Sequence, residues 1–181
     1  MEPTEITAGR LHLRPYAESD IDAVYACCQD PDIQRWITVP VPYERVHAKT
    51  YVREQTADGW RAGTGNSFAV VDSVSYELLA SIGLVSVNLR NKQAEVGFWT
   101  APGARGKGVA TQATQVVARW AFEDLGIERL EWMAEVGNVG SRRVAEKAGF
   151  TVEGVLRSRL VNRDGSRADA WIGALLPGDL R

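Results

Sequence analysis

The segment from Ala101 to Ala110 holds three glycines and two cationic side chains within ten residues. A β-rich run precedes it and a helical pattern follows it. Such a turn presents backbone N–H groups at a helix N-terminus, which carries about half a positive charge. Glycine lets an anion approach the backbone closely, and Arg105 and Lys107 add positive charge beside it. These features predict a binding site for a phosphate-bearing ligand.

Two common phosphate loops do not fit this segment. A Walker A loop would need a lysine where Val109 stands, although Gly103 and Gly108 have the required separation. A dinucleotide fingerprint could begin at Gly106, but Thr111 replaces its third glycine. A connection whose glycines serve only a tight turn is the remaining alternative.

The run Arg105-Gly-Lys-Gly-Val-Ala110 resembles the pyrophosphate-binding signature Arg/Gln-x-x-Gly-x-Gly/Ala of the GNAT superfamily of N-acyltransferases, and it matches at all three specified positions. Further segments resemble the RimJ/RimL-like branch, which acetylates the N-termini of ribosomal proteins: Leu11–Pro15, Asp30–Trp36, Glu95–Trp99, Asn138–Ser141, Glu146–Phe150 and Glu153–Arg157. The resemblance covers nearly the whole chain. One departure is Gln112-Ala113, where the branch commonly has Glu-Ala, and it concerns acceptor contacts rather than the cofactor site.

The resemblance implies acetyl-CoA as the co-substrate. Main-chain amides of one segment would bind its diphosphate, namely those of Arg105, Gly106, Lys107, Gly108, Val109 and Ala110. The strand end formed by Phe98, Trp99 and Thr100 would pair with the pantetheine amides. One N–H of that strand end would face the thioester carbonyl. Asn138 would hydrogen-bond the pantetheine arm.

Transfer of an acyl group to an amine requires the neutral amine. An α-amino group with a pKa near 8 is about 10% neutral at pH 7, and a lysine side chain is far less so. Glu95 lies on the strand before the turn, and the resemblance implies that a carboxylate here acts as a general base, often through water. The alternative is a solvent-facing glutamate or an ion-pair partner of Arg90 or Lys92.

Ser141 is the second predicted catalytic residue. The resemblance implies that its hydroxyl lies near the cofactor sulfur. A serine hydroxyl is a weak acid beside a thiol with a pKa of about 8.5, so we expect it to hydrogen-bond the leaving thiolate more than to deliver a proton. Asn138 has a structural alternative as the N-cap of a helix, where it would accept the N–H of Ser141.

Apolar periodicity and turn residues predict the elements that would position these groups. We expect strands near 10–16, 67–72, 78–88, 94–100, 128–136, 151–161 and 167–176, and helices near 20–29, 43–60, 110–125 and 141–148. Asp30-Pro31 is expected to end the first helix. This order predicts an α/β (α+β) fold. The resemblance implies a GNAT-type mixed, mostly antiparallel central sheet of about six to seven strands with about four helices around it.

The composition is that of a globular protein, and residues 1–181 are expected to form a single domain. A net charge of -2 without a long basic block argues against nucleic acid as a partner. With no secretory signal and no apolar run of ~18 residues, we expect a cytoplasmic protein without a membrane partner. The adjacent Cys27 and Cys28 and the separated His12 and His47 offer neither a disulfide nor metal-ligand spacing. Homodimerisation is left open.

Together these features predict an acetyl-CoA-dependent N-acetyltransferase, in which a primary amine of a protein N-terminus or a small molecule attacks directly in a ternary complex. The alternatives are an acyltransferase for a larger donor such as succinyl-CoA, and a non-catalytic acyl-CoA-binding module. Trp36 and Trp60 lie where the resembling family places its acceptor pocket, although core packing is the expected role of both.

Overall fold

A computed structural model describes residues 1–180, and their eight strands form one sheet. The strands are β1 (Ile6–Ala8), β2 (Leu11–Arg14), β3 (Phe68–Asp72), β4 (Leu78–Asn88), β5 (Gln93–Thr100), β6 (Arg129–Glu135), β7 (Thr151–Val161) and β8 (Arg167–Leu175). Their order is β1-β2-β3-β4-β5-β6-β8-β7, and β5–β6 is the parallel pair among otherwise antiparallel neighbours. The predicted mixed, mostly antiparallel sheet is confirmed. The strand beyond the expected seven is β1, whose three residues are too few to show an alternating pattern.

The described residues form six α-helices: α1 (Ile21–Cys27), α2 (Pro31–Trp36), α3 (Arg45–Thr50), α4 (Thr56–Ala62), α5 (Val109–Glu123) and α6 (Val139–Ala148). The π-helical segment η2 (Tyr51–Gln55) joins α3 to α4, which gives the long helix expected near 43–60. The sequence did not predict α2. Asp30 accepts the N–H of Ile33 and Pro31 occupies the first turn, so the dipeptide expected to end one helix also begins the next.

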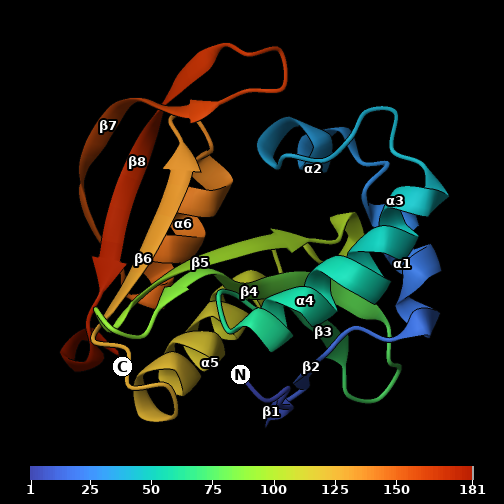
Figure 1. Ribbon diagram of the computed structural model, residues 1–181, viewed down its shortest axis with the longest axis horizontal. Helices are drawn as coiled ribbons and strands as arrows, with labels where there is room; N and C mark the ends of the chain where they lie inside the picture. Colours follow the sequence, from blue (N-terminus) through green and yellow to red (C-terminus); the bar gives the residue numbers. More distant parts are fainter. Residues whose placement is uncertain (181) are drawn as a thin grey trace.

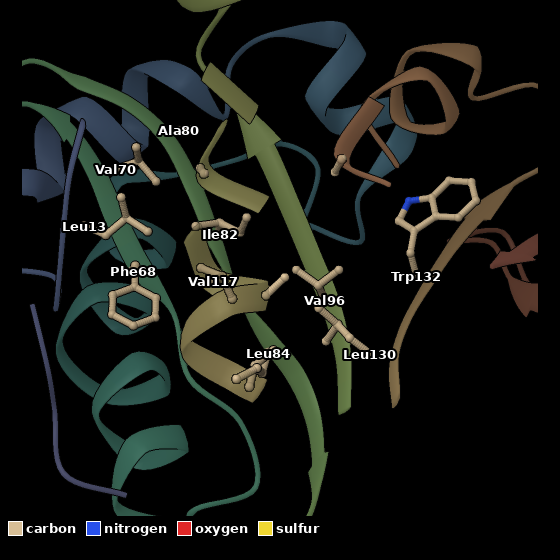
Figure 2. Close-up of a cluster of buried hydrophobic side chains, with 14 of the residues drawn as sticks. Leu13, Phe68, Val70, Ala80, Ile82, Leu84, Val96, Val117, Leu130 and Trp132 are labelled. Atoms are coloured by element: carbon tan, nitrogen blue, oxygen red, sulfur yellow. The ribbon is translucent and has the colours of Figure 1, made fainter. Parts of the chain in front are cut away.

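The sheet buries a separate apolar cluster on each face. On β3, Phe68 and Val70 belong to the cluster that includes α5, whereas Ala69 and Val71 belong to the cluster that includes α1 and α3. This alternation is the period of two of a strand that is covered on both faces. Figure 2 shows the α5 side, where Val117 of α5 lies among side chains of several strands. Helices on both faces therefore fix the position of the central strands.

The sheet divides between β5 and β6. Their parallel pairing begins at Gln93↔Arg129 and ends at Val96↔Trp132. Beyond that point β5 stays paired with β4 and β6 stays paired with β8. Figure 1 shows the two strands diverging toward their C-terminal ends. The inner edges of residues 97–100 and 133–135 therefore border an opening in which they are not paired with each other.

Candidate active site

A cleft of about 1370 Å³ opens where the sheet divides. It is lined by the ends of β5 and β6, the loop before α5, one face of α6, α2 and the hairpin between β7 and β8. Ligand clefts commonly measure about 300–1,000 Å³. This cleft therefore has room for an extended ligand and a second molecule beside it.

The glycine-rich loop presents the start of α5 to this cleft. Gly106 and Gly108 have φ angles of +74° and +80°, a region that residues with a side chain rarely adopt. Gly108 is the N-cap of α5 and provides no side-chain acceptor for its first N–H groups. Gly106, Gly108, Val109 and Ala110 all line the cleft. Backbone donors at the start of α5 can therefore receive an anion from the cleft side.

The two cationic side chains of this loop, Arg105 and Lys107, differ in whether they face the cleft. Arg105 lines the cleft, but its guanidinium pairs with Asp30 at 2.5 Å and with Asp32 at 3.3 Å. This contact lowers the pKa of the Asp30 carboxyl. Lys107 is exposed and does not line the cleft. Arg105 therefore ties the loop to the start of α2, and the backbone rather than these side chains provides the open donors.

The end of β5 turns its backbone edge toward the cleft. Phe98 packs against the cluster on the α5 side, and Trp99 packs against the cluster on the opposite face. Phe98, Trp99 and Thr100 all line the cleft. Because the side chains leave toward the two faces of the sheet, the edge toward β6 is free to pair with an extended ligand as an added strand does.

At the start of α6, Asn138 and Ser141 meet in the cleft. The Oδ1 atom of Asn138 accepts the Ser141 N–H at 3.1 Å, which is the N-cap arrangement considered from the sequence. Asn138 retains its amide donors, because its oxygen makes the cap. The Oγ atom of Ser141 accepts a hydrogen bond from the Trp132 indole N–H at 3.0 Å, a contact that the sequence did not reveal.

Glu95 lies on β5 one position before the end of the pairing with β6, where it is opposite Glu131. It is partly buried, and burial raises the pKa of its carboxyl, with a further rise from Glu131 and an opposing effect from Arg159. Glu95 is not among the residues that line the cleft. Any contact between its carboxylate and a molecule in the cleft would therefore have to pass through water or require movement.

Glu135 is a carboxylate that does line the cleft. Its oxygens accept two hydrogen bonds from Arg35 of α2, at 2.6 and 3.0 Å. The guanidinium lowers the pKa of Glu135 and makes it a weak base. Its evident role is to fix α2 against the end of β6.

The structure adds two cations that the sequence analysis did not select. Arg143 and Lys147 line the cleft from α6 and form no ion pair with any described residue. Their separation of four residues, which places both on one helix face, was the available signal. Without the fold, nothing distinguished this face of α6 from a solvated one.

The two tryptophans considered for the acceptor pocket lie in different places. Trp36 lines the cleft, whereas Trp60 is buried beside Phe68 and Trp120. Burial raises the pKa of the Cys27 thiol to about 11, which disfavours the nucleophilic thiolate.

Residues 1–180 lack two further features. No group of three or more His, Cys, Asp or Glu side chains there is arranged to hold a metal ion. Across the same residues, no helix has the length and apolar character needed to span a membrane.

Comparison with known proteins gives a family match and several similar structures. The family model of the acetyltransferase (GNAT) domain matches residues 10–151. YdaF of Bacillus subtilis, a putative ribosomal N-acetyltransferase, is 36% identical over 115 residues, which are 62% of each chain. A putative ribosomal-protein-serine acetyltransferase from Vibrio cholerae superposes with a TM-score of 0.86 at 20% identity, over 96% of this chain and 98% of that one.

A second solved structure, the microcin C7 self-immunity acetyltransferase MccE in complex with acetyl-CoA and AMP, superposes with a TM-score of 0.83. Its sequence is 20% identical, and the superposition covers 93% of each chain. At such identity the two solved structures establish a shared fold.

Proposed function

Because the chain belongs to the acetyltransferase (GNAT) family, as its motifs indicated, we propose that it transfers an acetyl group from acetyl-CoA to a primary amine. The observation behind this proposal is that the unpaired edge of β5 and the open amides at the start of α5 share one cleft. An extended arm with two amides suits the strand edge, and a diphosphate suits the helix start. Acetyl-CoA has both parts in one molecule.

In the proposed mechanism, the backbone of Arg105–Ala110 binds the diphosphate of acetyl-CoA. Phe98–Thr100 pair with its pantetheine arm and aim one N–H at the thioester oxygen. Asn138 donates to the same arm through the amide that its cap leaves free. All three segments contribute residues to the cleft wall.

The reaction proposed is direct attack in a ternary complex. The amine nitrogen forms a bond to the thioester carbon, negative charge develops on the carbonyl oxygen, and the carbon–sulfur bond then breaks with its electron pair going to sulfur. Glu95 receives the amine proton through water, because its pKa is raised by burial and it does not line the cleft. Ser141 hydrogen-bonds the departing thiolate.

The proposed acceptor is a primary amine of a protein N-terminus or of a small molecule. The name of YdaF, a putative ribosomal N-acetyltransferase, supports a protein acceptor, and MccE, which has the same fold, was solved with the small molecule AMP as well as acetyl-CoA. In this chain the cleft beyond the split is bordered by Trp36–Thr38 and by the hairpin residues 160–164. We place the acceptor there, away from the loop amides that would hold the diphosphate.

We also propose that residues 1–181 act as a single domain in the cytoplasm. The strands belong to one sheet, and both cysteines are free thiols, as is usual in a reducing compartment. Sedimentation or light scattering would measure whether two copies associate.

The test is incubation of the protein with acetyl-CoA and a panel of amines, with detection of free thiol and of the acylated product by mass. N-terminal peptides, free lysine and small amines make up the panel, and succinyl-CoA is run in parallel. Thiol release that depends on both enzyme and amine is the expected result. A rise in Tm with acetyl-CoA but no product from any amine would favour a binding module. Faster reaction with succinyl-CoA than with acetyl-CoA would show that succinyl-CoA is the preferred donor.

A further inference from the structure

A buried tryptophan reaches from the sheet to the predicted catalytic serine. Trp132 lies on β6 at the last pair before the split and is 1% exposed. Its indole N–H donates to the Ser141 Oγ atom, nine residues ahead in the first turn of α6. Figure 2 shows the indole on β6, at the edge of the core. The bond therefore crosses from a rigid strand to the helix that begins beside the cleft.

This bond uses the Ser141 oxygen as an acceptor and leaves the hydroxyl proton available. A hydroxyl has one proton to donate and lone pairs to accept with. The Trp132 indole, which can only donate, occupies one of the two acceptor lone pairs and leaves the proton free. The Ser141 proton has no acceptor among the described residues, and Ser141 lines the cleft. The free O–H proton is the group from which a thiolate can accept a hydrogen bond.

We propose that Trp132 is a positioning residue, whose indole N–H holds the Ser141 oxygen so that the serine proton points at the sulfur of the cofactor. This inference rests on the proposed function. When the carbon–sulfur bond breaks, its electron pair passes to sulfur, and the Ser141 O–H strengthens its hydrogen bond to the thiolate without losing its proton. The N–H···O–H···S chain is cooperative, since each bond polarises the next.

A tryptophan that only fills space makes a different prediction. In that case replacement by phenylalanine would cost the same whether or not Ser141 is present. If Trp132 acts through Ser141, its replacement matters while the hydroxyl is there and ceases to matter once it is gone. Residues that act as one unit show such non-additivity.

The first experiment measures kcat and acetyl-CoA Kd for Trp132→Phe, Ser141→Ala and the double variant. We expect kcat of Trp132→Phe to fall about 5-fold, the rate equivalent of one neutral hydrogen bond, with unchanged Kd. The double variant should be no slower than Ser141→Ala. If the double variant instead loses kcat by the product of the two single losses, the inference is overturned.

Trp120→Phe is the matched control for this cycle. Trp120 is a buried tryptophan on α5, packed against Phe68 and Trp60 on the same side of the sheet. The same atoms are removed, but no contact with Ser141 is lost. This variant should retain the kcat of the unmodified protein, and an equal loss in both tryptophan variants would mean that core packing explains the effect.

The second experiment does not depend on turnover. In protein labelled with ¹⁵N, the Trp132 indole signal is identified by its absence from Trp132→Phe. Coenzyme A should shift this signal more than desulfo-coenzyme A, which lacks the sulfur, and the difference should vanish in Ser141→Ala. Equal shifts with both ligands would overturn the inference and leave the proposed function intact. If coenzyme A moves no signal at all, the cofactor site fails, and this inference fails with it.

Discussion

At the scale of single residues, two glutamates near the split have opposite electrostatic settings. Arg35 lowers the pKa of Glu135, whereas burial raises the pKa of Glu95. A base gains proton affinity from a raised pKa and loses it beside a fixed cation. Their positions favour Glu135 instead, because Glu135 lines the cleft and Glu95 does not. Substitution of Glu95 tests whether the carboxylate with the higher pKa acts as the base, although it is not the one that lines the cleft.

Glu95→Gln should lower kcat by about 10²–10⁴-fold, the usual contribution of a general base, and leave the Kd for acetyl-CoA unchanged. In the unmodified protein the rate should fall as pH drops through the raised pKa of Glu95, and the variant should lack this acid limb. Turnover equal to that of the unmodified protein at every pH would remove Glu95 from the mechanism.

Glu131→Gln is the control for that substitution, because Glu131 lies opposite Glu95 on β6. Its charge contributes to the raised pKa of Glu95. Removal of this charge should move the acid limb of the rate profile to lower pH while the maximal rate is retained.

At the scale of elements, α2 is fixed by arginines from three directions. Arg105 of the glycine-rich loop contacts its N-cap Asp30, and Arg35 joins it to the end of β6. Arg163 of the β7–β8 hairpin donates to the Gln34 carbonyl oxygen. Within α2, Ile33 is the buried side chain. Polar contacts from three segments therefore position this wall of the cleft together with the packing of Ile33.

Arg35→Ala should loosen the C-terminal end of α2. We expect the KM for the amine to rise about 2- to 5-fold, the range of a partly exposed ion pair, with acetyl-CoA Kd little changed. Amide exchange over residues 31–37 should become faster. Arg45→Ala removes a surface pair with Asp22 outside the cleft and should change neither quantity. Unaltered exchange in Arg35→Ala would show that α2 is held by other contacts.

On α6, Arg143 and Lys147 line the cleft without a carboxylate partner among the described residues. Loop amides serve the diphosphate in the proposed binding mode, so we expect these cations to contact the 3′-phosphate of coenzyme A. The double variant to alanine should bind acetyl-CoA about 10-fold more weakly. Dephospho-coenzyme A, which lacks that phosphate, should show a much smaller loss.

Arg142→Gln is the control on the same helix, because Arg142 pairs with Glu146 and stacks on Trp171 instead of lining the cleft. It should bind both ligands normally. If the Arg143 and Lys147 double variant weakens coenzyme A and dephospho-coenzyme A equally, the two cations do not recognise the 3′-phosphate.

The start of α5 offers a test of the loop itself. Gly108→Glu introduces a carboxylate where the diphosphate is expected and strains a backbone with φ of +80°. Affinity for acetyl-CoA should fall by at least about 100-fold, since a like charge replaces an attractive site. Gly103→Glu is the control, because Gly103 does not line the cleft and a side chain there meets open space. Normal affinity in Gly108→Glu would contradict the loop assignment.

At the scale of the whole molecule, the burial of Glu95 lowers the free energy of unfolding at neutral pH, and this cost depends on pH. Burial raises the pKa of Glu95, so the folded state favours its protonated form. The corresponding stability is fully present below the ordinary glutamate pKa of about 4.3. It is lost as pH rises through the raised pKa, where the buried carboxylate becomes charged.

Glu95→Gln keeps a neutral side chain at every pH. Its Tm should therefore exceed that of the unmodified protein at pH 7, and the difference should shrink as pH falls toward 4. Thermal unfolding across that range measures the effect. A variant less stable than the unmodified protein at pH 7 would show that the interaction with Arg159 outweighs the cost of burial.

The sequence by itself determined the local features. Periodicity placed β4 and β7 with their observed bounds, and the glycines at 106 and 108 marked a turn, in which the structure gives both of them positive φ. Asn138 was recognisable as an N-cap, which the structure confirms. These features depend on neighbours within a few residues, so the local sequence encodes them. The family followed from motifs of the same short range.

Only the tertiary structure decided which distant groups share the cleft. Arg105 contacts an aspartate 75 positions away, and Arg35 contacts a glutamate 100 positions away. The contact of Trp132 with Ser141 and the exclusion of Glu95 from the cleft wall arise from where β5 and β6 separate. Such neighbours depend on how strands pair and helices pack over the whole chain, and no local periodicity reports that arrangement.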